Sequence, residues 1–322
     1  MYKSPDSHTE DCSIAYLGPQ GTFTEQAIFS QPDLTRMRHV LINDIAKVLV
    51  TVEAGDADLG LVPIENMLEG SVTATLDTLA FEANLLIQRE VVININLNLL
   101  AKPGVTLDEI SRVRSYPMAY AQCRNYLNKN LPKVLLEATH STAHAAREIA
   151  ASDDRSVAAI APQRSAEVYH LETLATDIED HPENQTRFVL VGRNKIVPPT
   201  GHDKTTLLVY QYDDVPGSLL ALLAEFSARS VSLTSLQSRP TRAALGQYCF
   251  LIECEGHIAD DVVADTMRGL HMKAADVKFM GSYPSALGTQ QEQTENRDGL
   301  TEAENWVAEL RQLISPERGS RT

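Results

Sequence analysis

The predicted order of strands and helices changes at one linker, and this change constrains the fold more than any other feature of the sequence. Residues 195–204 carry two prolines and one glycine, a composition typical of a connection between folded units. Before the linker, the order strand, loop, helix recurs, which predicts α/β units around a largely parallel sheet. After it, a β-α-β-β-α-β order is complete within about 80 residues, which is the signature of a ferredoxin-like fold.

Apolar periodicity places these elements along the chain. Before the linker it predicts strands at 13–17, 59–64, 93–99, 135–138, 156–160, 174–178 and 188–191, and one more that ends at Ser115. Helices are predicted after the capping-box pair Thr22 and Glu25, at 44–54 before Gly55, after Ser71, and at 107–112, 117–129, 142–151 and 162–169. After the linker we expect strands at 205–210, 231–236, 247–254 and 275–282 and helices at 216–228, 259–270 and 300–314.

The predicted strand at 93–99 carries asparagine at every second position. Asn94, Asn96 and Asn98 would share one face, although asparagine is a poor strand former. Two interpretations stay open: the amides line a polar cleft or a crossing between two lobes, or they form a solvated face.

Composition and charge exclude several classes of protein. The net charge of −15 gives no basic surface for a nucleic acid or for anionic lipid. No apolar run is long enough to span a membrane, and the polar first residues lack the apolar stretch of a secretion signal, so we expect a cytoplasmic protein. Four cysteines without a C-x-x-C pair predict no disulfide framework and no zinc site, and Cys249 and Cys254 would lie on opposite faces of one strand.

Three loops that precede helices carry hydroxyl or amide side chains: 18–24, 65–71 and 140–142. Helix starts favour anions, and in an α/β block such loops gather at the carboxyl ends of the strands. Ordinary capping explains any one loop, whereas several together predict a small anionic ligand. Arg187, just before a strand, is the best candidate to grip a carboxylate with both arms of its guanidinium, and a surface ion pair is the alternative.

Several motifs, taken together, resemble the prephenate dehydratase family. They are Tyr16–Thr24 (YLGPQGTFT), Val62–Asn66 (VPIEN), Glu69–Val72 (EGSV) and Asn184–Phe188 (NQTRF). Pro216–Leu219 (PGSL) and Ser238–Pro240 (SRP) are similar to motifs of the ACT regulatory domain found in that family. The resemblance runs in the same order from about residue 13 to residue 284.

The resemblance implies both a fold and an activity. The fold would be a two-lobed α/β catalytic domain at 12–194, like a periplasmic binding protein, with lobe 1 at about 12–92 and 180–194 and lobe 2 at 93–179. The linker at 195–204, a ferredoxin-like ACT domain at 205–284 and a polar tail at 285–322 with a C-terminal helix would follow. The activity would be the conversion of prephenate to phenylpyruvate in phenylalanine biosynthesis, without metal or other cofactor. L-Phenylalanine would act as effector through the ACT domain of a homodimer or homotetramer.

The same resemblance assigns site residues. The catalytic positions are Thr186, Arg187, Asn66, Ser115 and Gln122, and the substrate-binding positions are Thr22, Thr24, Glu65, Ser71 and Phe188. The effector positions are Gly217, Ser218, Leu219, Leu220, Gln237, Ser238, Arg239 and Pro240. The chain departs from the family pattern at Met67, Tyr116, Met118, Ser218 and Gln237.

The expected chemistry needs few groups. The ring of prephenate becomes aromatic as carbon dioxide and hydroxide leave, so the enzyme has to orient two carboxylates and assist the departing hydroxyl. We expect Thr186 to donate a hydrogen bond to the leaving oxygen, worth about 3 kcal/mol of barrier. Two other functions stay open: a non-catalytic amino-acid sensor, and a related enzyme that acts on arogenate.

Overall fold

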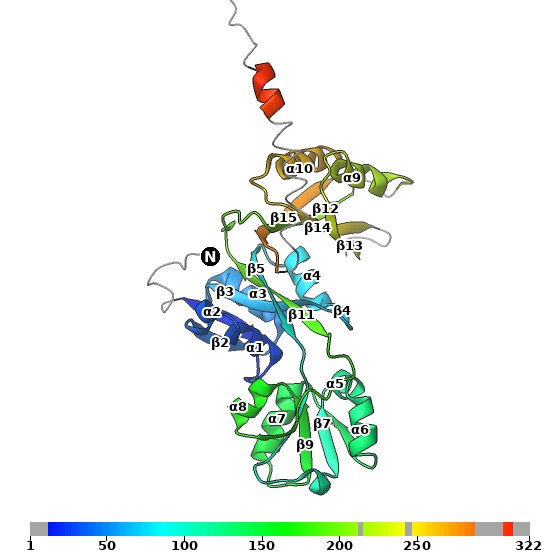
Figure 1. Cartoon of the computed structure of the whole chain (residues 1–322). Coiled ribbons are helices and arrows are strands. Elements are labelled where there is room, and N and C mark those ends of the chain that lie inside the picture. The colour runs from blue at the N-terminus through cyan, green and yellow to red at the C-terminus, as the bar shows by residue number, and fades with distance from the viewer. Residues whose placement is uncertain (1–11, 212–214, 242–246, 287–304, 312–322) are drawn as a thin grey trace, which may run out of the picture.

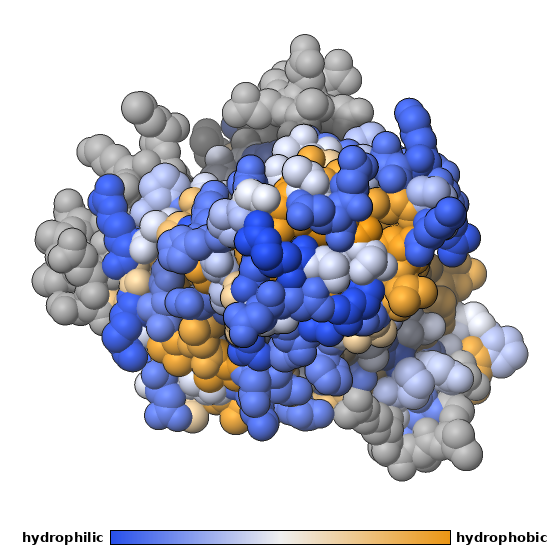
Figure 2. Space-filling model, turned by 90° about the horizontal axis from the view of Figure 1, so that it is seen from below, coloured by the Kyte–Doolittle hydropathy of each residue, from blue (hydrophilic) through white to orange (hydrophobic). Residues whose placement is uncertain are grey.

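Three sheets follow one another along the molecule (Figure 1). The computed structural model describes residues 12–211, 215–241, 247–286 and 305–311. We call the units built on these sheets the first lobe, the second lobe and the C-terminal unit; the first lobe lies between the other two. Within the described ranges, no helix is long and apolar enough to cross a membrane. The second-lobe end of the molecule is largely hydrophilic, with smaller apolar patches (Figure 2).

The first lobe is a mixed sheet in the order β2-β1-β3-β11-β5, with β4 paired to β3. Its strands are β1 (Ser13–Leu17), β2 (Arg38–Ile42), β3 (Leu59–Asn66), β4 (Gly70–Ser71), β5 (Leu86–Asn94) and β11 (Gln185–Gly192). Its helices are α1 (Phe23–Phe29), α2 (Pro32–Thr35), α3 (Ile45–Ala54) and α4 (Thr73–Phe81). β1 is parallel to β2 and β3, whereas β11 is antiparallel to both of its neighbours because it returns from the second lobe.

The second lobe has the strand order β10-β6-β9-β7-β8. Its strands are β6 (Asn98–Ala101), β7 (Arg112–Ser115), β8 (Leu135–Ala138), β9 (Val157–Ala161) and β10 (Glu172–Ala175). Its helices are α5 (Pro117–Ala121), α6 (Arg124–Asn130), α7 (Thr142–Ala151) and α8 (Gln163–Tyr169). Ser141 caps α7 as its hydroxyl accepts from the His144 N–H, and His140 lies before the helix.

The C-terminal unit has the predicted β-α-β-β-α-β order and the sheet order β13-β14-β12-β15. Its elements are β12 (Asp203–Tyr210), α9 (Ser218–Ser227), β13 (Leu233–Pro240), β14 (Tyr248–Glu255), α10 (Asp261–Lys273) and β15 (Asp276–Pro284). Cys249 and Cys254 face different cores, as the odd spacing predicts. In the tail, residues 305–311 are helical; residues 287–304 and 312–322 of that predicted segment lie outside the described residues.

Residues 93–99 are not one strand. β5 ends at Asn94 and β6 begins at Asn98, so the chain crosses from one lobe to the other between them. The side-chain oxygen of Asn94 accepts from the Gln185 side chain over 2.9 Å, and the Asn96 side chain donates to Asp177 over 2.8 Å. The asparagines therefore mark the crossing, because their amides bind the neighbouring segments there instead of continuing a ladder.

Three other sequence predictions were wrong in detail. The helix predicted at 107–112 is a single 3-10 turn (Leu107–Glu109), and Arg112 already belongs to β7. The helix predicted at 117–129 is two short helices, α5 and α6. Ser71 does not cap α4, because it pairs with β3 as part of β4 and the cap position is Val72.

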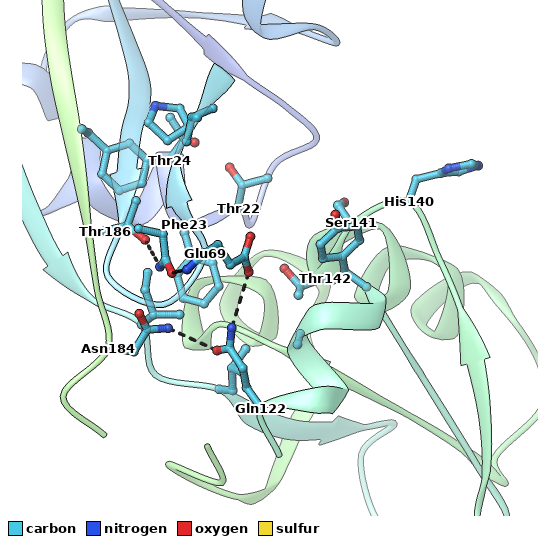
Figure 3. A pocket seen from close by; sticks show the side chains of 18 residues that line it. Thr22, Phe23, Thr24, Glu69, Gln122, His140, Ser141, Thr142, Asn184 and Thr186 are labelled. Carbon is cyan, nitrogen blue, oxygen red and sulfur yellow. Dashed lines mark hydrogen bonds between the residues drawn. The ribbon is translucent and has the colours of Figure 1, made fainter. Parts of the chain in front are cut away.

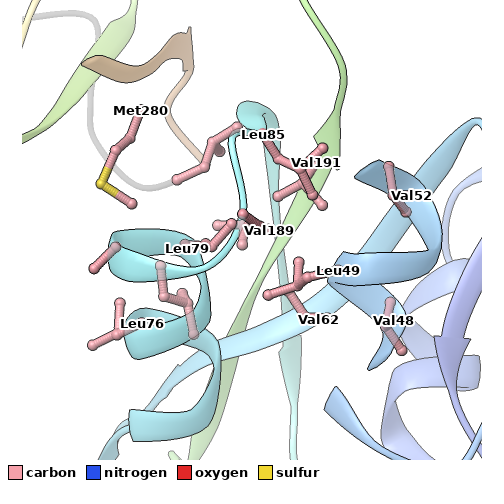
Figure 4. Close-up of a cluster of buried hydrophobic side chains, with 14 of the residues drawn as sticks. Val48, Leu49, Val52, Val62, Leu76, Leu79, Leu85, Val189, Val191 and Met280 are labelled. Carbon is pink, nitrogen blue, oxygen red and sulfur yellow. The ribbon is translucent and has the colours of Figure 1, made fainter. Parts of the chain in front are cut away.

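One apolar core joins the first lobe to the C-terminal unit (Figure 4). Leu76 and Leu79 of α4 belong to the same buried cluster as Met280 of β15 and Leu251 of β14. Gly281 makes this approach possible, because a Cβ on it would lie 2.4 Å from the carbonyl oxygen of Ile87 in β5. Its φ of +137° also favours glycine.

Candidate active site

A pocket of about 290 Å³ lies where the two lobes and their crossing segment meet (Figure 3). The first lobe contributes the start of α1, the end of β3 and the start of β11, and the second lobe contributes α5 and the start of α7. The lining residues are Thr22, Phe23, Thr24, Pro63, Asn66, Glu69, Val72, Ile95, Leu97, Tyr116, Ala119, Gln122, His140, Ser141, Thr142, Asn184, Thr186 and Phe188. The sequence placed six of these residues in the site: Thr22, Thr24, Asn66, Gln122, Thr186 and Phe188.

Asn66 fixes the direction of the Thr186 hydroxyl. The Asn66 carbonyl accepts from the backbone N–H groups of Leu68 and Glu69, each over 3.0 Å, so its amide nitrogen must point the other way. That nitrogen donates to Thr186 Oγ1 over 2.8 Å. Since the hydroxyl oxygen already accepts this bond, its proton remains available to a molecule in the pocket.

A second set of polar groups lines the pocket beside Thr186, and it joins Gln122 of the second lobe to Glu69 and Asn184. Gln122 donates to Glu69 Oε1 over 3.4 Å and accepts from Asn184 Nδ2 over 3.2 Å. The side-chain oxygen of Asn184, Oδ1, is buried and makes no hydrogen bond among the described residues. A bound molecule with a donor can satisfy it, because an unpaired buried acceptor otherwise costs about 1–3 kcal/mol.

The pocket combines an acidic group with features that attract anions. Burial raises the pKa of the Glu69 carboxyl, which favours its neutral form. Ser141 and Thr142 stand at the start of α7, where free N–H groups and the helix dipole favour negative charge. His140 is the one basic side chain in the lining, which contains neither lysine nor arginine among the residues that the structure describes.

Thr22 and Thr24 come from the first loop of the cleft. The Thr22 hydroxyl caps α1, as it accepts from the Glu25 N–H and donates to the Leu17 carbonyl. Thr24 is buried in the first turn of α1. On the far side of this loop, Arg164 of α8 pairs with Glu25 over 2.9 Å, and Ser165 donates to the Gly21 carbonyl over 2.7 Å. These contacts hold the loop against the second lobe.

Arg187 does not reach the pocket. Successive residues of a strand point to opposite sides, so Thr186 and Phe188 face the pocket while Arg187 faces away. Its guanidinium is buried and pairs with Glu65, Glu90 and Glu253. Burial alone lowers the pKa of Arg187, but Glu253 and Glu90 outweigh this and keep it raised, so the group stays charged. The predicted carboxylate clamp was therefore wrong, and Glu65 also lies outside the lining.

Ser115 and Ser71 also lie outside the pocket. Ser115 is fully buried at the end of β7, and its hydroxyl donates to the Ile160 carbonyl over 2.7 Å. Ser71 donates to Gln237 Oε1 of the C-terminal unit over 3.0 Å. Both hydroxyls bind protein groups, in the core and between units respectively. Of the departures from the family motifs, Tyr116 lines the pocket, whereas Met67 and Met118 do not.

The predicted effector residues are divided between two faces of the C-terminal sheet. Gly217–Leu220 open α9, which packs with Phe226 on the face that carries Phe250 and Ile252. Gln237 and Arg239 lie opposite Leu251 and Cys249, which face the first lobe. Arg239 pairs there with Asp77 of α4. Within the described chain, Gln237 and Arg239 therefore do not share a face with Gly217–Leu220, whereas Ser238 and Pro240 do.

Sequence reasoning missed Asn184, Glu69 and His140 as pocket residues. Asn184 and Glu69 stand inside quoted motifs, and His140 opens one of the three loops expected to bind an anion. A stricter use of strand alternation would have separated Thr186 from Arg187, because adjacent side chains cannot enter the same cleft. No sequence pattern, in contrast, indicates which residues surround and bury Arg187.

Comparison with known proteins identifies the relatives of this chain. The family model described as prephenate dehydratase matches residues 14–196. The chain is 40% identical to a curated prephenate dehydratase from Mycolicibacterium gilvum over 310 residues, which cover 93% of this chain and 98% of that protein.

Solved structures agree with the sequence match. A prephenate dehydratase from Arthrobacter aurescens in complex with L-Phe superposes with a TM-score of 0.80 at 38% identity, covering 93% of this chain and 99% of that one. A protein described as a quorum quenching acylase superposes with a TM-score of 0.78 at 27% identity, covering 85% and 98%. The predicted fold class, an α/β two-lobed unit followed by a ferredoxin-like unit, is confirmed.

Proposed function

The chain belongs to the prephenate dehydratase family, so its activity is that of a prephenate dehydratase, and we propose that the pocket between the lobes is where it acts. The hydrogen bond from Asn66 to Thr186 carries this proposal. Because of this bond, the hydroxyl proton of Thr186 points into the pocket, toward a bound substrate. The pocket wall formed by Phe188, Ile95 and Leu97 is apolar.

In the reaction, the bond from the ring to one carboxylate breaks and its electron pair enters the ring. The bond from the ring to the hydroxyl breaks at the opposite carbon, and the oxygen leaves with that bonding pair. The dianion becomes phenylpyruvate, carbon dioxide and hydroxide, so atoms and charge balance. The Thr186 proton stabilises the oxygen as negative charge builds on it, which a preorganised donor does most effectively in a site shielded from water.

The substrate carboxylates need other partners than Arg187. The start of α7 at Ser141 and Thr142 offers N–H groups and the positive end of the helix dipole on the second-lobe side, and His140 adds a ring nitrogen that can bind a carboxylate there. Gln122 and Asn184 add amide groups, and the raised pKa of Glu69 lowers the cost of placing a dianion beside that carboxyl. The catalytic set that we propose is therefore Thr186, Asn66 and Gln122, with Thr22, Thr24 and Phe188 shaping the pocket.

We also propose that the C-terminal unit is an ACT domain through which L-phenylalanine regulates the enzyme. Its β-α-β-β-α-β order supports this, and so does the relative from Arthrobacter aurescens, whose structure contains L-Phe. Gly217–Leu220 with Ser238 and Pro240 are the proposed effector positions on the helix-bearing face. Gln237 and Arg239 are instead assigned to contact with the first lobe.

The proposed division of the chain is a catalytic domain at 12–194, a linker at 195–204 and an ACT domain at 205–284. Copies of the chain would associate as a homodimer or homotetramer in the cytoplasm. Size-exclusion chromatography with light scattering gives the number of chains, with and without L-phenylalanine.

Steady-state turnover tests the function. Purified full-length protein is given prephenate or, separately, arogenate, and phenylpyruvate or phenylalanine is measured with and without added L-phenylalanine. We expect turnover of prephenate that changes with L-phenylalanine. A higher kcat/KM for arogenate than for prephenate would show that arogenate is the preferred substrate. No turnover of either compound would favour the alternative of a non-catalytic amino-acid sensor.

A further inference from the structure

A buried group of charges joins the C-terminal unit to the back of the active-site strand. Arg187 Nη1 lies 2.6 Å from Glu90 Oε1 and 2.9 Å from Glu253 Oε2, and Lys204 Nζ lies 3.4 Å from Glu90 Oε1. The side chains of Glu90 and Glu253 are 0% and 4% exposed. The buried part of the group holds two cations and two anions, and a third carboxylate, that of the half-exposed Glu65, contacts Arg187 from the edge.

These charges come from separate parts of the chain. Arg187 belongs to β11 and Glu90 to the neighbouring strand β5, whereas Glu253 and Lys204 belong to β14 and β12 of the C-terminal unit. The other arm of the Arg187 guanidinium, Nη2, binds Glu65 of β3 over 3.0 Å. One side chain therefore connects both strands that flank β11 and the C-terminal sheet behind them.

The ladder between β3 and β11 is irregular at this point. Thr186 lies opposite Asn66 and Arg187 opposite Glu65, but the register shifts between Arg187 and Phe188, so that Phe188 lies opposite Pro63. A bulge leaves a residue unpaired, and proline has no N–H for the ladder. The extra residue is Ile64 of β3, so the ladder fixes Thr186 less firmly on that side, whereas on the other side Thr186 and Arg187 pair without interruption with Ile93 and Val92 of β5. Side-chain contacts therefore have more influence on the side where Thr186 meets Asn66.

We propose that Glu253 of the C-terminal unit is a positioning residue for the reaction: it anchors Arg187 and thereby holds Thr186 against Asn66. This inference rests on the proposed role of Thr186. Glu253 touches no part of the pocket, so its effect passes through β11. Misplacement of a reacting group by about 1 Å can lower the rate about 100-fold, and a bond made in the transition state affects kcat more than KM.

Glu253→Gln tests the proposal, because the amide keeps the shape of the side chain and removes its charge. Glu255→Gln is the control: it removes the same charge two residues further along β14, from a half-buried carboxyl opposite Lys204 that forms no ion pair within the described chain. Thermal unfolding identifies variants that are folded at the assay temperature. We expect Glu253→Gln to lose about tenfold or more in kcat with KM within about twofold, while Glu255→Gln matches the unmodified protein.

Thr186→Ala is measured in the same assay to separate two failures. If it retains the full kcat, the proposed role of Thr186 is wrong. If it loses activity while folded Glu253→Gln keeps the kcat of Glu255→Gln, or changes only KM, the positioning role of Glu253 is overturned and that of Thr186 stands. If Glu253→Gln does not fold, Glu253→Asp replaces it; this variant keeps the charge but withdraws the carboxylate by one methylene, and an unchanged kcat overturns the proposal equally.

Discussion

The Asn66 side chain donates to Thr186 Oγ1 over 2.8 Å, and this bond joins two residues that are 120 positions apart in the chain. The Asn66 carbonyl is held by two backbone N–H groups, so the amide cannot exchange its nitrogen and oxygen without losing both bonds. The Thr186 hydroxyl is therefore an acceptor toward the protein and a donor toward the pocket.

Asn66→Asp is expected to reverse this polarity. A carboxylate oxygen in place of the amide nitrogen accepts a bond from Thr186, which turns the hydroxyl proton away from the ligand. We predict a fall in kcat of about 100-fold, similar to the loss of a preorganised donor, although the two side chains have nearly the same shape. Steady-state kinetics with prephenate measure this, with Thr186→Ser as the control that keeps the hydroxyl. A kcat near that of the unmodified protein would show that Asn66 does not orient Thr186.

Ser115→Ala distinguishes the family expectation from the structure. Because Ser115 is buried and donates to the Ile160 carbonyl, its removal should cost about 1 kcal/mol in the free energy of unfolding. We expect kcat to stay within about twofold, since the hydroxyl does not line the pocket. Gln122→Ala, which removes a lining amide, should lower kcat in the same assay. A large loss of kcat in Ser115→Ala without loss of stability would show that Ser115 takes part in the reaction after all.

Glu69 should give the enzyme an alkaline limb in its pH profile. Burial raises the pKa of Glu69 above its ordinary value of 4.5, so the carboxyl stays neutral to a higher pH than usual. Above that raised pKa the ionised group repels a dianionic substrate, and kcat/KM should fall as pH rises. Glu69→Gln should remove this limb, because the amide does not titrate. The rates are corrected at each pH for uncatalysed conversion, and an identical limb in both proteins would assign it to another group.

Gly281→Ala should separate the C-terminal unit from the first lobe. The new methyl group would meet the Ile87 carbonyl at 2.4 Å, in addition to the cost of a positive φ. Gly70→Ala is a matched control, because Gly70 also has a positive φ, of +79°, but has no atom within 4 Å of the added carbon. We expect Gly70→Ala to cost about 1 kcal/mol in unfolding free energy and Gly281→Ala several times more. Thermal melts that shift equally would contradict the close approach of β15 to β5.

Cys254 should resist alkylation in the folded protein. Burial raises its pKa to about 12, and the nearby Glu253 and Glu255 add to this shift. At pH 8 the reactive thiolate is then only about one part in 10,000. Iodoacetamide followed by peptide mass spectrometry should find Cys254 unlabelled in buffer and labelled in denaturant. Rapid labelling without denaturant would mean that the C-terminal sheet opens readily.

Local pattern was sufficient for much of the fold. The capping side chains of Thr22, Asp44 and Ser141 stand where the predicted helices begin, because a cap acts on backbone groups within three residues. The opposite facing of Cys249 and Cys254 also follows from spacing alone. The prediction of one strand at 93–99 was wrong because the segment that crosses between the lobes shows the same alternation of apolar and polar residues as a strand does. Only the partners of Asn96, which lie about 80 residues away, distinguish the two.

The sequence by itself determined the family, the order of elements and most of the polar groups around the pocket, because these depend on local spacing and on motifs of a few residues. Only the tertiary structure decided which side of β11 faces the ligand and where the charge of Arg187 goes. A strand has two equivalent faces until its neighbours cover one of them. Here Glu90 and Glu253, from a neighbouring strand and from a different unit, bury the arginine on one face and leave Thr186 to the cleft on the other.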